Sequence, residues 1–361
     1  MSLKFLWYIP NTVQPGHRGD EVSVGLTNLH RSTELARLCE DHGWSGALLG
    51  TGWGRPDTFT VATALVARTT NFQPLIAIRP GFWRPAHFAS AAATLDQISE
   101  GRVLVNVVSG IDNLAAYGDR EGEQAERYAR TREFIQLIRR LWSEDAVTFR
   151  GEHFWVENST LAQRPYRANA GCHPLLYFGG ASPAAERVSA TEADVQLFWG
   201  EPLVGIEERI SRLKGLSESL GRAHPPLEFG LRVTTVVRET TEEAWHDAEQ
   251  RVAKMEADRQ SGAQRRADGL DRRARGQQRL LELAEQGEVL DTCLYTAPGK
   301  YGGDGAGTTW LVGSYDDVAD ALGRYRDLGV THFVLSDTPY KEETIRVGDH
   351  LIRRLHEPVS G

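Results

Sequence analysis

The sequence predicts an α/β fold, a (β/α)8 barrel of the TIM type that spans residues 1–361 as one domain. Two observations carry this prediction. Short apolar runs alternate with longer amphipathic ones along almost the whole chain, and eight of the short runs have the composition of strands. These runs are nearly continuous in apolar residues, which is typical of parallel strands covered on both faces. We therefore expect a closed barrel and not an open, doubly wound sheet.

The first four strands are each followed by a helix. The strands are expected at 3–10, 46–50, 73–79 and 102–110, and the helices at 29–43, 57–70, 86–99 and 125–142. In each helical segment the apolar residues recur every three or four positions, so that one face can pack on the strands.

The second half of the chain continues this alternation. Strands are expected at 175–180, 195–201, 229–239 and 332–337, and helices at 183–193, 205–221, 241–256 and 342–357, with one more helix at 315–329. The two halves together supply the eight strands that a barrel of this type requires.

Two segments interrupt the alternation. Residues 146–158 are predicted to form a small hairpin. Residues 256–310 form a long insertion with a charged run at 258–279 and a glycine-rich end at 297–309. Acidic residues are mixed into the charged run and aromatic residues are absent from it, which favours a solvated helical face over a nucleic-acid surface. The insertion is predicted to be a lid beside the active site or a disordered loop.

Composition limits the classes of function. Hydrophobic residues make up 40% of the chain and charged residues 25%, as in ordinary soluble globular proteins. A net charge of −8 gives no general attraction to nucleic acids or anionic membranes. Three distant cysteines without a Cys-x-x-Cys pair indicate neither disulfides nor a metal site. The apolar run at the start is too short for a signal peptide or a membrane span, so a cytoplasmic location is expected.

The stretch YFGGAS at 177–182 is the first candidate for a binding site, because it joins a strand to the start of a helix. Glycines allow a ligand to approach the backbone, and the first amides of a helix bind anions such as phosphate. An ordinary turn with Ser182 as N-cap and Pro183 at the first helical position explains the same residues. By contrast, GTGWG at 50–54 is a weak match to a dinucleotide-binding motif.

Polar and aromatic residues within or just after the predicted strands are further candidates. Arg232 interrupts an apolar strand, where burial requires either a structural ion pair or an anionic ligand. Asn106 interrupts another strand and is either a satisfied core amide or a ligand contact. Trp53 and Trp199 lie near strand ends, where an aromatic surface can pack on a planar cofactor or belong to the core.

Longer motifs carry a resemblance to a known family. They are FLWYIPN, RPGFWRPAHFASAAATLDQISEGRVLVNVVSG, ERYARTREFIQLIRRLW, LLYFGGAS, FWGEP, LRVTTVVRETTEEAW and FVLSDTPYKEETIRVG. Together they resemble the bacterial-luciferase superfamily of flavin-dependent monooxygenases, nearest to alkanesulfonate monooxygenase and dimethyl sulfone monooxygenase. The resemblance implies a homodimer or homotetramer that takes reduced FMN from a separate NAD(P)H-dependent flavin reductase and uses O2.

The resemblance also implies roles for individual residues. FMN is expected to contact Thr51, Asn106, Arg127, Tyr128, Gly180, Ala181 and Ser182. The residues expected on the substrate side are Arg55, Trp199, Arg232 and Thr234. The chain departs from alkanesulfonate monooxygenases, which have a cysteine in place of Arg55, a histidine in place of Thr234 and a tyrosine in place of Thr338. Their lid arginine falls near Gly303, and Lys300 is the nearest cation.

These expectations combine into one functional hypothesis. The chain is predicted to be a two-component monooxygenase that uses reduced FMN and O2 to oxygenate a small organic molecule. An alkanesulfonate or a related organosulfur compound, with cleavage of the C–S bond, is one candidate substrate, and the departures above leave room for another. The alternatives are a deazaflavin-dependent oxidoreductase of the same superfamily and a non-catalytic flavin-binding paralogue.

Overall fold

The computed structural model describes residues 3–11, 27–53, 55–109, 114–119, 123–260, 275–301 and 308–356. Within these residues eight parallel strands close a barrel in the order β1-β2-β3-β4-β7-β8-β9-β13, and β13 pairs with β1. The strands are β1 (Lys4–Ile9), β2 (Gly46–Leu49), β3 (Gln73–Ile78), β4 (Leu104–Val107), β7 (Leu175–Gly179), β8 (Val195–Trp199), β9 (Glu228–Arg238) and β13 (Val330–Ser336). The predicted (β/α)8 barrel is therefore confirmed.

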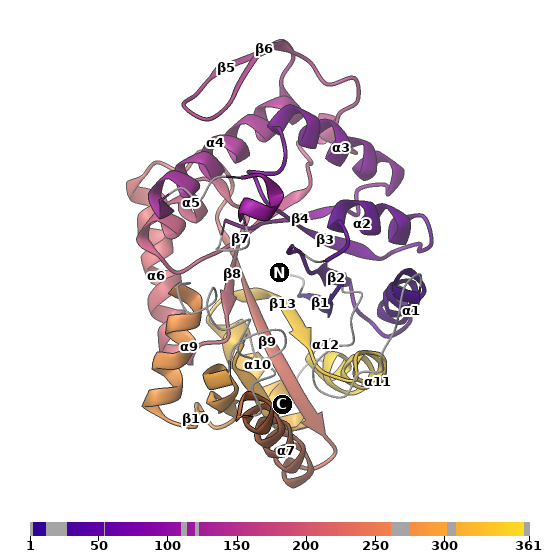
Figure 1. The fold of residues 1–361 in the computed structure, drawn as a ribbon, viewed down its shortest axis with the longest axis vertical. Helices are drawn as coiled ribbons and strands as arrows, with labels where there is room; N and C mark the ends of the chain where they lie inside the picture. Colours follow the sequence, from indigo (N-terminus) through magenta and orange to yellow (C-terminus); the bar gives the residue numbers. More distant parts are fainter. Residues whose placement is uncertain are drawn as a thin grey trace.

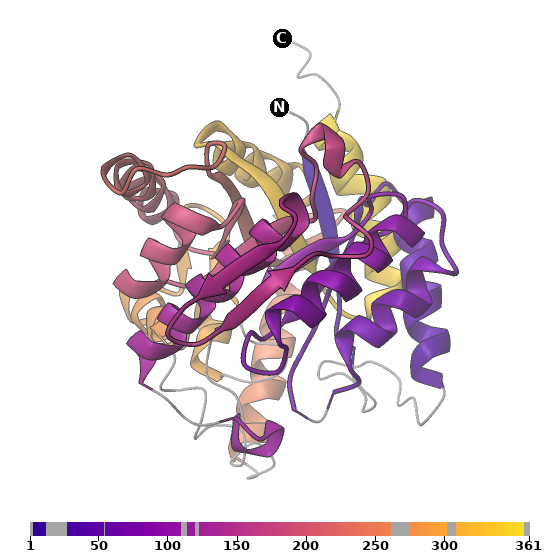
Figure 2. The same cartoon turned by 90° about the horizontal axis from the view of Figure 1, so that it is seen from above.

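The helices pack around this barrel. They are α1 (Thr27–Asp41), α2 (Thr58–Val66), α3 (Pro85–Ile98), α4 (Gln124–Ser143), α5 (Pro183–Glu192), α6 (Leu203–Ser219), α7 (Thr241–Gln260), α10 (Tyr315–Asp327), α11 (Tyr340–Arg346) and α12 (Arg353–His356), with the π-helical segment η4 (Val347–Ile352) between the last two. In Figure 1, α1 to α6 follow one another around the outside of the strands. Figure 2 gives the view from above, in which the helices cover the strands. None of the helices in the described residues is long and apolar enough to span a membrane.

Alternating residues of each strand belong to different cores. Leu6, Leu48, Leu75 and Val334 pack together inside the barrel, whereas their neighbours along the chain pack between the strands and the helices. Since side chains alternate across a strand, the residue two positions further on also faces the interior. This periodicity places Tyr8, Asn106, Trp199 and Ser336 on the inner face at the carboxyl ends of their strands, and Arg232 lies level with Trp199 and Val334.

A small two-stranded sheet lies outside α4. Its strands, β5 (Val147–Arg150) and β6 (Trp155–Ser159), pair antiparallel, and Figure 1 shows them beyond the ring of helices. The carboxylate of Glu133 on α4 accepts the backbone amides of Glu152, His153 and Phe154 at 2.8, 2.9 and 3.2 Å. These three bonds attach the turn between the strands to α4.

The described part of the insertion at 256–310 contributes to the main sheet. It includes α9 (Arg275–Gln286), β10 (Val289–Leu290), β11 (Leu294–Tyr295) and the short helix η3 (Ala297–Tyr301). β11 pairs with β12 (Trp310–Ser314), and β12 lies parallel to the second half of β9. β12 was not predicted from the sequence, because it directly follows the glycine-rich stretch of the insertion.

The lid proposed for this insertion stays a prediction. Residues 261–274, in the charged run, and residues 302–307, which include Gly303, lie outside the described residues. The extent of the domain and of its insertions likewise stays a prediction.

The buried carboxyl of Asp96 on α3 makes stability depend on pH. Burial raises its pKa to about 6, although the backbone amides of Tyr166 and Val103 donate to it. The folded state therefore binds a proton between about pH 4 and 6 that the unfolded chain does not bind. We expect the free energy of unfolding to fall across this range as the pH rises, by at most about 3 kcal/mol.

Asp96→Asn should remove this part of the pH dependence, since asparagine does not titrate. Denaturant unfolding of both proteins at pH 4 to 7 measures the slope. The control is Asp320→Asn, which replaces an exposed carboxylate on α10 and should leave the slope unchanged. An Asp96→Asn protein with the parental slope would show that Asp96 does not titrate in this range.

Candidate active site

Arg232 lies on the inner face of β9 and stacks on the ring of Tyr8. Its guanidinium carbon is 4.6 Å from the centre of that ring. The Nε atom is buried without a hydrogen-bond partner, and no carboxylate of the described residues forms an ion pair with the side chain. The sequence allowed Arg232 to belong to a structural ion pair. In the described part of the chain, Arg232 forms no such pair. A cation–π contact compensates only in part for burial of the charge, so an anion would be favoured here.

Gly50, directly after β2, brings Arg55 close to Tyr8. A Cβ at Gly50 would lie 2.8 Å from the Tyr8 hydroxyl and 3.2 Å from Nη1 of Arg55. Only glycine leaves room for both groups. Arg55 also donates to the backbone carbonyl of Pro10. Arg55, Tyr8 and Arg232 thus follow one another at the mouth of the barrel. The sequence analysis did not single out Tyr8, although its position two residues after the interior Leu6 would have suggested it.

The other predicted substrate-side residues have different surroundings. Thr234 is buried, and its hydroxyl lies 3.0 Å from that of Thr308 and 3.3 Å from that of Ser336. Trp199 is half-buried and pairs in register with Arg232 across the β8–β9 ladder. Thr338 is buried directly after β13. Thr234 is therefore held by neighbouring strands, whereas Trp199 borders the same region as Arg232.

Asn106 lies on the inner face of β4, in register with Ala77 of β3 and Tyr177 of β7. It is half-buried, and its side-chain amide makes no hydrogen bond to a described residue. A satisfied core amide would have an internal partner. The amide thus remains available to a ligand in the barrel mouth.

The loop between β7 and α5 begins a helix and leaves room for a ligand. Ser182 is the N-cap of α5, and its hydroxyl accepts the amide of Ala185 at 3.3 Å. Gly180 has a φ of +149°, and a Cβ on it would come within 2.5 Å of the Cβ of Ala185. The Tyr128 hydroxyl lies 3.7 Å from the same point, so the loop and the start of α4 adjoin. The N-cap prediction is confirmed. Because Pro183 has no amide hydrogen and Ser182 accepts the amide of Ala185, the amide of Ala184 is the one in the first turn of α5 that remains for an anion.

Arg209 on α6 fixes the conformation of this loop. Its side chain is only 9% exposed and donates to the Gly180 carbonyl at 2.7 Å. It also donates to Glu201 at 2.8 Å and to Glu186 at 3.3 Å. The two carboxylates compensate the charge of Arg209, and the third bond holds the backbone of Gly180. Arg209 was not predicted from the sequence, because its place in an amphipathic helix resembles that of any solvated arginine.

A small cavity links the start of α4 to the end of β3. Its volume is about 20 Å³, and its lining includes Arg79, Val108, Ser109 and Arg127. The hydroxyl of Ser109 lies 2.6 Å from that of Thr131, which joins the end of β4 to α4. The predicted cofactor residues Arg127 and Tyr128 therefore lie next to the carboxyl ends of β3 and β4.

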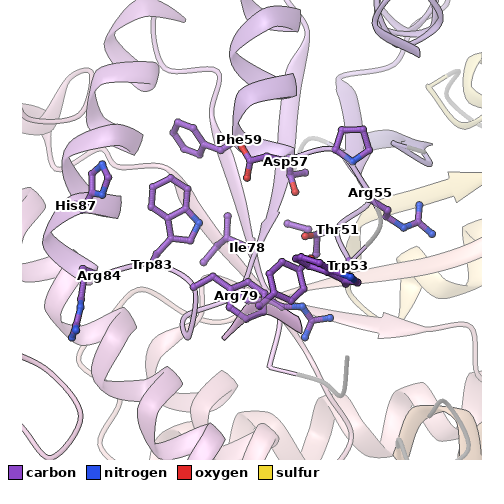
Figure 3. A pocket seen from close by; sticks show the side chains of 16 residues that line it. Thr51, Trp53, Arg55, Asp57, Phe59, Ile78, Arg79, Trp83, Arg84 and His87 are labelled. Atoms are coloured by element: carbon purple, nitrogen blue, oxygen red, sulfur yellow. The ribbon is translucent and has the colours of Figure 1, made fainter. Parts of the chain in front are cut away.

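A large pocket follows the ends of β2 and β3. It has a volume of about 790 Å³, within the range of ligand-binding pockets. It is lined by Thr51, Gly52, Trp53, Arg55, Pro56, Asp57, Thr58, Phe59, Ala77, Ile78, Arg79, Phe82, Trp83, Arg84, His87 and Tyr117. Figure 3 shows Phe59 and Trp83 on one side of Ile78 and Thr51 and Trp53 on the other. Of the residues predicted from the sequence, the pocket brings together Thr51, Trp53 and Arg55.

Comparison with solved structures shows the same fold in several enzymes. A riboflavin lyase, RcaE, solved with modified FMN and riboflavin, is 18% identical with a TM-score of 0.75, and the match covers 98% of this chain and 91% of that one. An EDTA monooxygenase from Chelativorans sp. BNC1 is 15% identical with a TM-score of 0.75, over 98% and 93% of the two chains. A coenzyme F420-dependent tetrahydromethanopterin reductase from Methanopyrus kandleri is 17% identical with a TM-score of 0.68, over 98% and 100%.

The family itself follows from the sequence match. The model of the luciferase-like monooxygenase family matches residues 3–332, which is most of the chain. The barrel described above is the fold that the sequence resemblance implied, and the prediction that the chain is an enzyme of this class is confirmed at the level of the family. The chain belongs to the luciferase-like monooxygenase family.

Proposed function

We propose that the chain is a monooxygenase that uses reduced FMN and O2 to oxygenate a small organic anion, with the flavin supplied by a separate NAD(P)H-dependent reductase. The observation that carries the proposal is Arg232, a cation on the inner face of the barrel that no carboxylate of the described residues neutralises. Arg232 is half-buried with its Nε atom fully enclosed, so its charge is only partly solvated, and an anionic substrate would compensate it.

The residues around the barrel mouth fit FMN. Gly180 keeps the loop open where a Cβ would collide with α5, and the amide of Ala184 at the start of α5 would be available to a phosphate. Tyr128 adjoins this loop, and Asn106 has a side-chain amide without an internal partner that would bond the ring. When bound, reduced FMN would supply the electrons that activate O2. The chain itself would hold the phosphate, orient the ring and exclude water.

On the substrate side, Arg232 and Arg55 would hold the anionic group. Both adjoin Tyr8, one through its ring and the other beside its hydroxyl. Arg232 has no carboxylate partner among the described residues, and a sulfonate or carboxylate of the substrate would supply one. Trp199, level with Arg232, would form an apolar wall. An alkanesulfonate or a related organosulfur compound remains one candidate, because sulfonates carry this charge.

A deazaflavin-dependent oxidoreductase is the second candidate. The similarity in fold to the F420-dependent reductase supports it, since the same barrel serves both classes of enzyme. The two candidates differ in oxygen use, because only the monooxygenase incorporates an oxygen atom from O2 into its product.

The purified protein should bind reduced FMN more tightly than oxidised FMN under anaerobic conditions, because a two-component enzyme captures the reduced product of its reductase. The aerobic protein with reduced FMN is then mixed with sulfonates, sulfones and carboxylates in ¹⁸O2, and the products are measured by mass spectrometry. A product that contains ¹⁸O supports the proposal. Binding of F420 with hydride transfer and no oxygen uptake would establish the second candidate, and flavin binding without any product would indicate a non-catalytic paralogue.

A further inference from the structure

The buried carboxylate of Glu201 lies between the insertion and the loop at 180–182, here called the phosphate loop. Glu201 follows β8 in the motif FWGEP and is 4% exposed. Its Oε1 atom accepts a hydrogen bond from Nη1 of Arg209 at 2.8 Å, and its Oε2 atom accepts one from Nε of Arg279 at 3.1 Å. Arg209 belongs to α6, whereas Arg279 belongs to α9 in the insertion. One carboxylate therefore connects two helices that are far apart in the sequence.

The corner between β8 and α6 leaves room for this contact. Gly205, in the first turn of α6, has no side chain, and a Cβ there would lie 3.2 Å from Oε2 of Glu201 and 3.6 Å from Nη2 of Arg279. A second residue of the insertion, Asp291, accepts the backbone amide of Leu203 at 2.6 Å. The insertion thus holds this corner at two neighbouring points, a side chain and a backbone amide.

Arg209 connects this corner to the phosphate loop. Its Nη1 atom donates to Glu201, its Nη2 atom to the carbonyl of Gly180 at 2.7 Å and its Nε atom to Glu186 at 3.3 Å. The guanidinium also packs on Phe198, with its carbon 4.7 Å from the ring centre. A planar guanidinium with a partner on every nitrogen has little freedom to turn, so it fixes the direction of the Gly180 carbonyl.

The direction of this carbonyl decides where the next amide points. The peptide bond between Gly180 and Ala181 is trans, and the C=O and N–H groups of a trans peptide point to opposite sides. Since Arg209 binds the carbonyl, the amide of Ala181 points away from Arg209. This amide donates to no group of the described residues. It is therefore available to a phosphate oxygen, together with the amide of Ala184.

We propose that Glu201 is a positioning residue for the phosphate of FMN, and that α9 strengthens FMN binding through its ion pair with Glu201. The inference rests on the proposed function. When Glu201 loses its charge, Arg209 keeps Glu186 as its one charged partner among the described residues. Its guanidinium can then turn away from the phosphate loop, and the amides of the loop lose their direction.

The insertion acts through the same contacts. Without Arg279, the Oε2 atom of Glu201 loses the cation that orients it, and the hold of Glu201 on Arg209 becomes weaker. A coupling free energy between two sites is reciprocal, so a bound phosphate should in turn hold α9 in place. The exchange of α9 amides with solvent is therefore a second readout, independent of flavin affinity.

FMN and riboflavin separate the effect on the phosphate from an effect on the ring, because riboflavin has the same ring system without the phosphate. Their dissociation constants are measured anaerobically, with both flavins reduced, by fluorescence titration. Glu201→Gln should weaken FMN binding by about 2- to 30-fold and leave riboflavin binding nearly unchanged. A merely structural role of Glu201 would weaken binding of both flavins alike or lower only the melting temperature.

Arg279→Met is the second variant, because this side chain is 33% exposed and can be replaced even if Glu201→Gln does not fold. It should weaken FMN binding by about 2- to 5-fold and leave riboflavin binding unchanged. Hydrogen–deuterium exchange of α9 should slow when reduced FMN binds to the parent protein, and Arg279→Met should lose this protection. The control is Arg140→Met, which removes an ion pair of similar exposure at the end of α4 and should change none of these values.

The outcomes distinguish this inference from the proposed function. Equal losses for FMN and riboflavin, or no loss for FMN in either variant, would overturn the inference, whereas FMN binding by the parent protein would leave the proposed function standing. A specific loss in Glu201→Gln alone would overturn the role of α9. Equal affinity of the parent protein for both flavins would overturn the whole inference, since the phosphate would then make no contact. If the parent protein bound neither flavin, the proposed function would be wrong and the inference with it.

Discussion

Arg232→Met should lower kcat/KM by about 10- to 100-fold, with little change in thermal stability. A charge-assisted contact to an anion contributes roughly 1.5–3 kcal/mol, which corresponds to this loss. Methionine fills a similar volume on the ring of Tyr8, and no ion pair among the described residues is broken. The measurements are the melting temperature and the steady-state kinetics of the same purified variant, with the substrate identified by the ¹⁸O2 experiment.

Arg238→Met is the matched control for this prediction, because Arg238 lies on the same strand. Its side chain pairs with Asp247 at 2.6 Å and with Glu343 at 3.2 Å, so its loss removes the partner of Asp247 and leaves the buried Glu343 with Arg346 alone, at 3.4 Å. This variant should lose stability and keep its kinetic constants in the folded fraction. If Arg232→Met behaved like Arg238→Met, Arg232 would be a structural residue and the proposed anion site would be wrong.

Ser182→Asp should weaken binding of reduced FMN by about 1–3 kcal/mol, or roughly 5- to 150-fold in the dissociation constant. The carboxylate would lie at the helix start proposed for the phosphate, where two negative charges repel each other. Aspartate caps a helix as well as serine does, so α5 should remain as stable as before. Fluorescence titration with anaerobic FMN and a thermal melt of the variant measure both properties.

Ser314→Asp provides the comparison for this second prediction. Ser314 is also a serine N-cap, that of α10, and its hydroxyl accepts the amide of Asp317 at 3.2 Å. We expect no change in flavin affinity from this variant. An unchanged affinity in Ser182→Asp as well would mean that the phosphate does not lie at the start of α5.

Most strands of the barrel can be predicted from local patterns of apolar residues in the sequence. The runs that became β1 to β4, β7 to β9 and β13 are apolar over several residues, because both faces of each strand are covered. β12 was not predicted because it follows a glycine-rich stretch within the insertion and because its partner, β9, lies more than seventy positions earlier in the chain. A strand so short is specified by its pairing partner, which sequence periodicity does not reveal.

The candidate site, like the barrel, could be predicted from the sequence only in part. Arg232, Asn106 and residues 180–182 could be predicted as candidates from the sequence. Polar residues are conspicuous within apolar strands, and glycines are conspicuous just before a helix. Whether Arg232 pairs with a carboxylate depends on which side chains the closed barrel brings near it, and the described structure places the ring of Tyr8 there instead.

The remaining features depend on contacts between distant segments. Arg209 reaches the carbonyl of Gly180 from a helix 29 residues away, and its sequence neighbours are those of an ordinary amphipathic helix. The large pocket joins the loops after β2 and β3 with Tyr117. Local sequence determines which backbone conformation and which buried face each segment prefers, because these preferences arise from neighbouring residues. The surroundings of a side chain are decided by the register and closure of the barrel, which set the distances between segments that the sequence separates.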